Sequence, residues 1–192
     1  MKIGEEVLSN LNDNYRRIRN TFRFLLGNIG HSNTDNIFKY SELEEIDKFI
    51  LARLYEIENI RKKSLKDYTF HIFYKALFEF CTVDLSSFYF DIRKDVLYCN
   101  DIEERTRKNK IKILFKVLEK LTDWYAPVLC HTMEEVWQKY KAENIDSVHL
   151  KQYKEIDIVW KNTNILEKWE KIKKVRKTIN TAIEIARNDK KL

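Results

Sequence analysis

Apolar residues recur at three- and four-residue spacing along most of this 192-residue chain, and only one proline interrupts them. That spacing places apolar side chains on one face of an α-helix, so it predicts long amphipathic helices. A sheet protein of this length would need many more turn residues than three glycines and one proline. Hydrophobic residues make up 44% and charged residues 34% of the chain, which argues against disorder. We therefore predict an all-α fold, a bundle of about five to seven helices.

The segments with helical spacing are joined by short breaks. The sequence predicts helices over residues 3–29, 43–63, 67–81, 85–97, 103–125, 132–140 and 164–187, with the third and fourth able to join as one bent element. Pro127 cannot continue the hydrogen-bond ladder of a helix, so it predicts the break before residue 132. Residues 144–160 lack helical periodicity, and we expect an irregular segment that folds back over the bundle.

Two short motifs have the spacing of a capping box, in which a Ser or Thr hydroxyl accepts a hydrogen bond from the amide three residues later. The first runs from Ser41 to Glu44 and the second from Thr132 to Glu135. They predict the starts of the second helix and of the short helix after Pro127.

Lysine and arginine are concentrated at the C-terminal end of the chain. Residues 161–192 hold ten Lys or Arg and four acidic residues, which accounts for the whole formal net charge of +6. We therefore divide the chain into a helical bundle, residues 1–160, and a basic C-terminal helix, residues 161–192. A basic tail favours the phosphate backbone of a nucleic acid, but a solvated helix face fits the same charges.

The segment from residue 15 to residue 29 combines a buried stripe with a basic ridge. Its apolar side chains share one helix face: Tyr15, Ile18, Phe22, Leu25, Leu26 and Ile29. Arg16, Arg19 and Arg23 line another face of the same helix. A ridge of arginines favours an anionic partner, although a solvated charged face gives the same periodicity.

The chain lacks the motifs that mark many enzymes and membrane proteins. It contains no Gly-rich phosphate loop, no His-Glu-x-x-His pair and no Gly-x-Ser-x-Gly elbow, and we interpret the adjacent Cys130 and His131 as structural residues. We expect no catalytic, cofactor-binding or metal-ligating residue. Three widely spaced cysteines predict reduced thiols, and no apolar run reaches about 18 residues. Both features favour a cytoplasmic protein without a membrane partner, which we expect to be monomeric.

Several blocks resemble isoleucyl-tRNA synthetases, in the same order and spacing as in that family. The segment Lys2–Leu8 looks like the one that follows the second ATP-binding signature, and Tyr15–Ile29 looks like the helix that opens the anticodon-binding bundle. The most specific block is Phe80–Tyr98. The end of the family's bundle is matched by Trp124–Leu129, Glu134–Trp137 and Ser147–Leu150.

This resemblance implies the anticodon-binding domain of a class Ia aminoacyl-tRNA synthetase. The chain would be one part of a larger ligase that joins isoleucine to its tRNA using ATP and Mg²⁺. Catalytic and editing domains would precede it, and a C-terminal module, often zinc-binding, would follow the basic helix. The chain lacks both ATP-binding signatures, so we expect it to be inactive alone. Its implied partners are the anticodon stem-loop of isoleucine tRNA and the other domains of the ligase.

RNA recognition of this kind uses cations on phosphates and aromatic or polar groups on unpaired bases. The candidate tRNA-binding residues are Arg16, Arg17, Arg19, Arg23, Arg93, Lys94, Trp137, Lys173, Lys174, Arg176 and Lys177. Two of them have alternative roles. Trp137 can fill the core instead of stacking on a base, and Arg19 can pair with a neighbouring helix or with the catalytic domain.

A helical protein-interaction module with no RNA role is the alternative from a different class of function. Its apolar stripes would dock a protein partner, and its basic tail would only aid solubility. An exposed apolar groove favours this alternative, whereas a concave surface lined by Arg and Lys favours RNA. An isolated hydrolase or transferase is a third interpretation, which requires a deep pocket with converging polar groups.

Overall fold

The computed structural model describes residues 4–30, 38–101, 104–140 and 145–188, and helices dominate these residues. The α-helices are α1 (Glu5–Ile29), α2 (Glu45–Lys66), α3 (Phe70–Glu79), α4 (Phe90–Cys99), α5 (Arg105–Tyr125), α6 (Cys130–Tyr140) and α7 (Thr163–Asn188). A π-helix, η2 (Phe80–Tyr89), joins α3 to α4, and the 3-10 turns are η1 (Tyr40–Glu42), η3 (Val148–Leu150) and η4 (Ile158–Trp160). The described residues contain no strand, and the predicted all-α bundle is confirmed.

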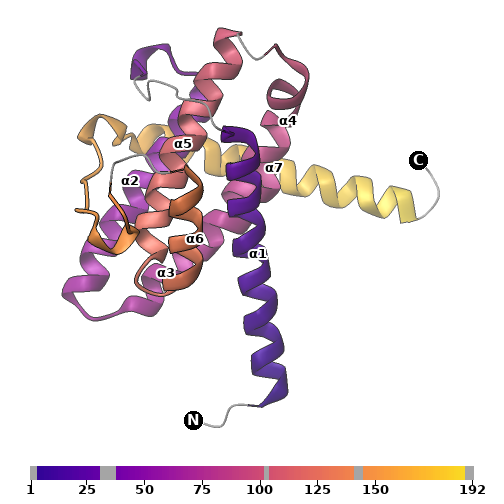
Figure 1. Ribbon diagram of the computed structural model, residues 1–192. Helices are drawn as coiled ribbons and strands as arrows, with labels where there is room; N and C mark the ends of the chain where they lie inside the picture. Colours follow the sequence, from indigo (N-terminus) through magenta and orange to yellow (C-terminus); the bar gives the residue numbers. More distant parts are fainter. Residues whose placement is uncertain (1–3, 31–37, 102–103, 141–144, 189–192) are drawn as a thin grey trace.

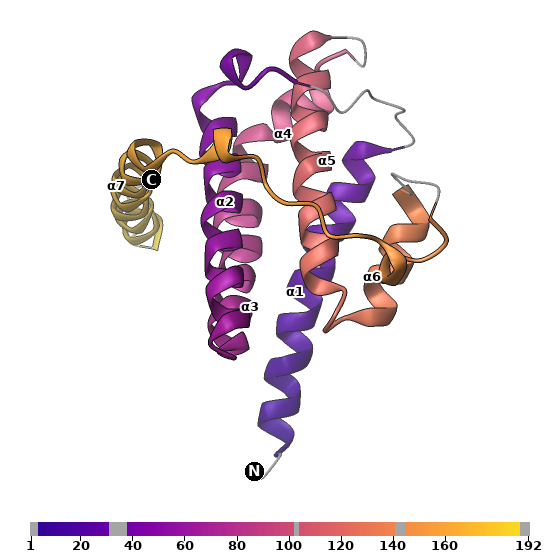
Figure 2. The same ribbon diagram turned by 90° about the vertical axis from the view of Figure 1, so that its left-hand side faces the viewer.

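Helix α5 lies at the centre of the bundle, where it contacts α1, α2, α4 and α6. Figure 2 shows α2 and α3 side by side, with α5 and α1 next to each other beyond them. Helix α6 packs against both α1 and α5. The N-terminal part of α1 and the C-terminal part of α7 extend beyond the bundle in different directions (Figure 1). Every residue from Gly4 to Asn14 is exposed, so only the second half of α1 helps to form the core.

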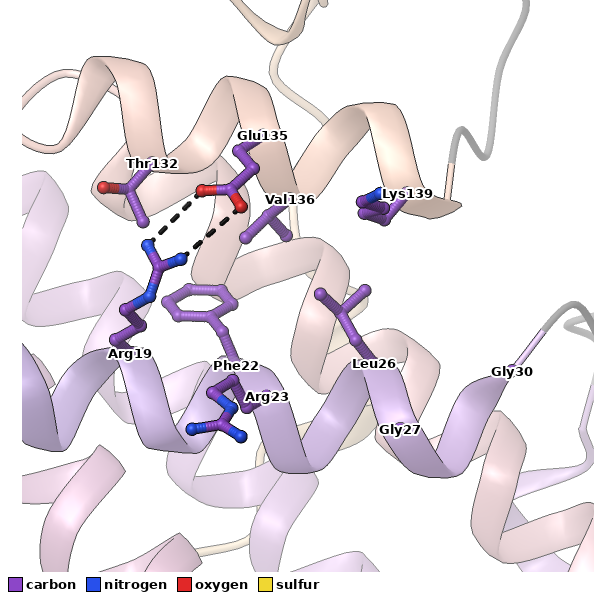
Figure 3. A pocket seen from close by; sticks show the side chains of 10 residues that line it. All are labelled: Arg19, Phe22, Arg23, Leu26, Gly27, Gly30, Thr132, Glu135, Val136 and Lys139. Atoms are coloured by element: carbon purple, nitrogen blue, oxygen red, sulfur yellow. Dashed lines mark hydrogen bonds and ion pairs between the residues drawn. The ribbon is translucent and has the colours of Figure 1, made fainter.

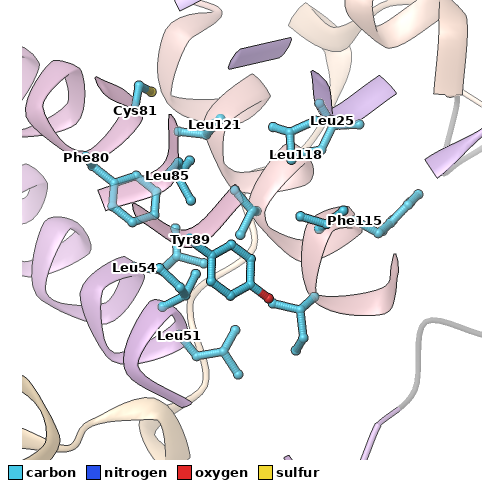
Figure 4. Close-up of a cluster of buried hydrophobic side chains, with 14 of the residues drawn as sticks. Leu25, Leu51, Leu54, Phe80, Cys81, Leu85, Tyr89, Phe115, Leu118 and Leu121 are labelled. Atoms are coloured by element: carbon cyan, nitrogen blue, oxygen red, sulfur yellow. The ribbon is translucent and has the colours of Figure 1, made fainter. Parts of the chain in front are cut away.

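The core brings together apolar side chains from helices that are distant in sequence, as Figure 4 shows. Leu25 of α1, Leu54 of α2 and Leu118 of α5 have no exposed surface. Phe80 and Tyr89 of η2 are equally buried among them. Truncating such a side chain to alanine typically costs about 2–5 kcal/mol. These contacts fix the second half of α1 against α5, and so they position the basic ridge.

Helices α3 and α4 form one continuous element, because η2 joins them without a break. This outcome matches the prediction that the two segments can join. Within η2, the Ser86 hydroxyl donates to the carbonyl of Cys81 at 2.8 Å, and the Ser87 hydroxyl donates to that of Thr82 at 2.9 Å. Both bonds span five residues, which is the spacing of the wider π-helical turn. Asp84 also lies in η2, where it pairs with Arg53 and Lys173.

Both predicted capping boxes are wrong. Ser41 lies in the 3-10 turn η1, and α2 begins at Glu45 without a side-chain cap at Glu44. Thr132 and Glu135 lie inside α6, which already begins at Cys130. The hydroxyl of Thr132 instead bonds to Tyr15 of α1 at 3.0 Å. The spacing alone did not distinguish a cap from a helix face that contacts a neighbouring helix.

The described part of the predicted irregular segment crosses the bundle between α6 and α7, as Figure 2 shows, whereas residue 144 lies outside the described residues. It contains η3 and η4, and Val148 and Trp160 are buried. Lys151 pairs with Asp123 of α5 at 2.7 Å. Of the break predicted between residues 29 and 43, the structure describes residue 30 and residues 38–42, the last three of which form η1.

The first half of α7 packs on the bundle. Ile165 is buried, and the ring of Trp169 stacks on Phe49 of α2 with 5.6 Å between centroids. Lys168 pairs with Glu45 at 2.8 Å.

The division of the chain into a helical bundle and a basic C-terminal helix at residue 160 stays a prediction. Among the described helices, none has a segment apolar and long enough to span a bilayer.

Candidate nucleic-acid interface

Arg93 lies inside the bundle. Only 5% of the residue is exposed, and its guanidinium lies 2.9 Å from Asp47 and 2.7 Å from Glu44. Lys110 of α5 contacts the same carboxylates, at 2.6 Å and 2.5 Å respectively. Burial disfavours the ionised form of Glu44, but hydrogen bonds from Lys110 and Arg93 outweigh burial and lower its pKa. The predicted RNA contact of Arg93 does not fit this buried position.

Lys173 is also held within the fold. Its ammonium lies 2.7 Å from one carboxylate oxygen of Asp84, which is 2% exposed. Arg53 of α2 donates to the other oxygen at 2.9 Å. Burial opposes the charge of Lys173, but Asp84 outweighs it and raises the pKa of the lysine. Asp84 therefore joins η2, α2 and α7, and Lys173 serves the fold.

The remaining cations predicted on α4 and α7 differ in their partners. Arg176 and Lys94 both pair with Asp91, each at 3.0 Å. Lys174 and Lys177 are exposed, and neither makes an ion pair with a described residue. Only the last two are therefore available to an anion without breaking an existing pair.

Trp137 fills the core. It has no exposed surface, and its indole N–H donates to the carbonyl of Ile145 at 3.0 Å. Its ring meets that of Tyr140 edge to face at 5.4 Å. The structure therefore supports the alternative role of Trp137, and stacking on a base would require it to leave the core.

The four arginines of α1 have different environments. Arg19 donates to both carboxylate oxygens of Glu135 in α6, at 3.3 and 3.5 Å, and so it forms the interhelical pair that was its alternative role. The side chain of Arg16 is 73% exposed and pairs with Asp13 on its own helix at 3.0 Å. Arg17 and Arg23 are exposed, with no ion pair to any described residue. The ridge of α1 therefore presents cations that the fold leaves accessible.

A groove of about 400 Å³ separates α1 from α6 next to this ridge. Figure 3 shows Phe22 and Leu26 of α1 facing Val136 of α6, with the Arg19–Glu135 pair across one end. The remaining lining residues are Arg23, Gly27, Gly30, Thr132 and Lys139. The floor is thus apolar, and the rim carries charged groups.

The polar end of the groove is held in place by a small hydrogen-bond network. The Tyr15 hydroxyl lies 3.0 Å from that of Thr132, and it accepts from Arg19 at 3.3 Å. Hydrogen bonds to Thr132 and Arg19 lower the pKa of Tyr15. Arg19 therefore has two partners, Tyr15 and Glu135, which fix the direction of its guanidinium.

Gly27 leaves one wall of the groove open. It lies inside α1, where glycine is less favourable than alanine by roughly 0.5–1 kcal/mol. A Cβ atom added there would meet no atom within 4 Å, so no neighbour requires a glycine. Its effect is to expose helix backbone in the groove.

Comparison with known proteins identifies the family. The family model for the anticodon-binding domain of tRNA ligases matches residues 47–192. The chain belongs to this family. Its relatives include the isoleucine–tRNA ligases of Pelagibacter ubique, which is 40% identical over 100% of this chain, and of Bartonella henselae, which is 37% identical over 100% of it. The chain spans about a fifth of the length of these relatives, 21% and 20% respectively.

Of the ten groove residues of this anticodon-binding domain, only Arg19 and Arg23 were predicted as site residues from the sequence, and Gly27, Glu135 and Lys139 are among the eight that were not. Glu135 and Lys139 are four residues apart, which places them on one face of α6. That spacing was visible in the sequence. It did not reveal that this face lies opposite the arginine ridge of α1.

Proposed function

We propose that this anticodon-binding domain holds the anticodon stem-loop of isoleucine tRNA as part of an isoleucine–tRNA ligase. The observation that carries the proposal is the set of unpaired cations beside a groove. Arg23 of α1 and Lys139 of α6 both line it and make no ion pair with a described residue. RNA phosphates bind such cations and release their counterions, which provides affinity.

The groove also bears on the alternative of a protein-interaction module. An apolar floor alone would favour a protein partner. Here Arg23 and Lys139 flank the floor, and Arg16 lies on the same ridge of α1. The combination of apolar floor and basic rim supports RNA as the partner, because unpaired bases have apolar faces and charged backbones.

A second partner is proposed for the projecting part of α1, namely the other domains of the ligase. Val7, Leu8 and Leu11 lie close together on this helix and are 42%, 56% and 59% exposed. Apolar side chains at this spacing form one face that suits contact with protein. ATP and Mg²⁺ would serve the full-length ligase in those other domains, in the cytoplasm.

The proposal is tested by titrating the chain with two RNAs over a salt series, using fluorescence anisotropy. One RNA is the anticodon stem-loop of isoleucine tRNA, and the other has the same stem with a different anticodon. Contacts from Arg16, Arg23 and Lys139 predict a slope of log affinity against log salt of about −2 to −3. A preference for the isoleucine anticodon supports recognition. Equal affinity for both RNAs would show charge attraction alone and would contradict the proposal.

A further inference from the structure

We infer that the groove between α1 and α6 is a binding site for one unpaired nucleotide of the RNA loop. The base would lie on the apolar floor, its edge would face the Arg19–Glu135 pair, and the adjoining phosphate would contact Arg23 and Lys139. This inference rests on the proposed RNA function and gives it a specific site.

The shape and size of the groove fit a nucleotide. Its volume of about 400 Å³ lies within the ~300–1,000 Å³ typical of small-ligand sites. Phe22, Leu26 and Val136 provide the apolar contact that the face of a base requires. The open wall at Gly27 lets a planar group approach the backbone of α1 closely.

The Arg19–Glu135 pair can read the edge of a base. The side chains are 44% and 57% exposed, so both remain accessible in the groove. The guanidinium has donors beyond the two that Glu135 occupies, and the carboxylate has spare acceptor positions. Because Tyr15 also holds Arg19, the pair offers a donor and an acceptor in a fixed orientation. A base that presents an acceptor next to an amino group complements this pattern.

The charges at the rim fit the phosphate of the same nucleotide. Lys139 is exposed on the last turn of α6, and Arg23 is exposed on α1. Both line the groove without an acid of the described residues to neutralise them. The two cations therefore complement the charge that accompanies every nucleotide.

The main test fills the groove through Gly27→Leu. The new side chain has space at this position, and leucine favours the helix more than glycine does. The matched control is Asn12→Leu, which adds the same side chain at an exposed position of the projecting part of α1. Thermal unfolding of both variants verifies that they fold.

Affinity is measured for the isoleucine anticodon stem-loop and for a set of the same RNA with one loop base removed at a time. Loss of a stacked base typically costs about 5- to 150-fold in affinity. We expect the wild-type chain to lose this factor at one loop position. Gly27→Leu should show the weakened affinity already with the intact RNA and lose nothing more when that base is removed. Asn12→Leu should behave as the wild type.

A second variant distinguishes the contribution of the phosphate contact from that of the base contact. Lys139→Gln should make the slope of log affinity against log salt shallower by about 0.7 to 0.9, whereas Gly27→Leu should leave the slope unchanged. Unchanged affinity of Gly27→Leu for the intact RNA would overturn the inference and leave the proposed function standing. If Gly27→Leu weakened the affinity for a duplex without a loop by the same factor as for the stem-loop, this result would also overturn the inference. If the wild-type chain binds none of the RNAs at low salt, the proposed function fails, and the inference fails with it.

Discussion

Replacing Arg93 by methionine should destabilise the domain without weakening RNA binding. Arg93 is buried, and its guanidinium lies 2.9 Å from Asp47, which has no exposed surface. A hydrogen bond to a charged group contributes about 1.5–3 kcal/mol. The second pair, with the half-exposed Glu44, adds roughly 0–1 kcal/mol. Lys110 and Tyr89 still contact Asp47 after the change, so the carboxylate is not left alone. The expected loss is therefore about 1.5–4 kcal/mol of unfolding free energy.

The measurement is urea unfolding followed by far-UV circular dichroism. The matched control is Lys94→Met, one residue further along the same helix, where the side chain is 51% exposed. This control should change stability by no more than about 0.5 kcal/mol. The midpoint of Arg93→Met should fall at an unchanged m-value, and its folded state should bind the stem-loop RNA like the wild type. Stability within 0.5 kcal/mol of the wild type, together with weakened RNA binding, would refute the internal role of Arg93.

Three further predictions concern the ridge, the anchor of α7 and the thiols. The double change Arg16→Glu and Arg23→Glu should lower RNA affinity and its salt dependence in an anisotropy titration. In a full-length ligase the same change should leave isoleucyl-adenylate formation nearly unchanged. An unaltered RNA affinity would contradict the contacts of these arginines with the RNA backbone. Asp84→Asn should weaken the attachment of α7, which hydrogen exchange would detect as faster exchange of its amides than in the wild type. Burial raises the pKa of Cys81 to about 12, so a thiol reagent should label the exposed Cys99 and Cys130 and spare Cys81 until the domain unfolds. Labelling of Cys81 as fast as the other two would contradict its burial.

The helices were predictable because their apolar spacing is a local property of the sequence. The spacing placed the break near Pro127 correctly, since α5 ends at Tyr125 and α6 begins at Cys130. The capping boxes were predicted wrongly because the role of a Thr hydroxyl is not a local property of the sequence. Whether Thr132 caps α6 or contacts Tyr15 depends on a helix more than a hundred residues away, and no local pattern contains that information.

The cations were identified as a group, but their individual roles could not be predicted. Arg93 and Lys94 are neighbours in sequence, yet one is buried against Asp47 and the other is half exposed. On α7, Lys173 and Lys174 differ in the same way, because only Lys173 faces Asp84. The fold decides which cation meets an acid, and the sequence only shows that both are basic.

The same distinction determines which cations an RNA can use. An RNA that bound through Arg93 or Lys173 would have to break a buried ion pair, and for Arg93 the loss is the same ~1.5–4 kcal/mol. Binding through Arg23 or Lys139 breaks no ion pair with a described residue and displaces only water and counterions. Substitutions in these two sets of cations should therefore affect different measured properties. Variants of the internally paired Arg93 and Lys173 should alter stability, whereas variants of Arg23 and Lys139 should alter RNA affinity.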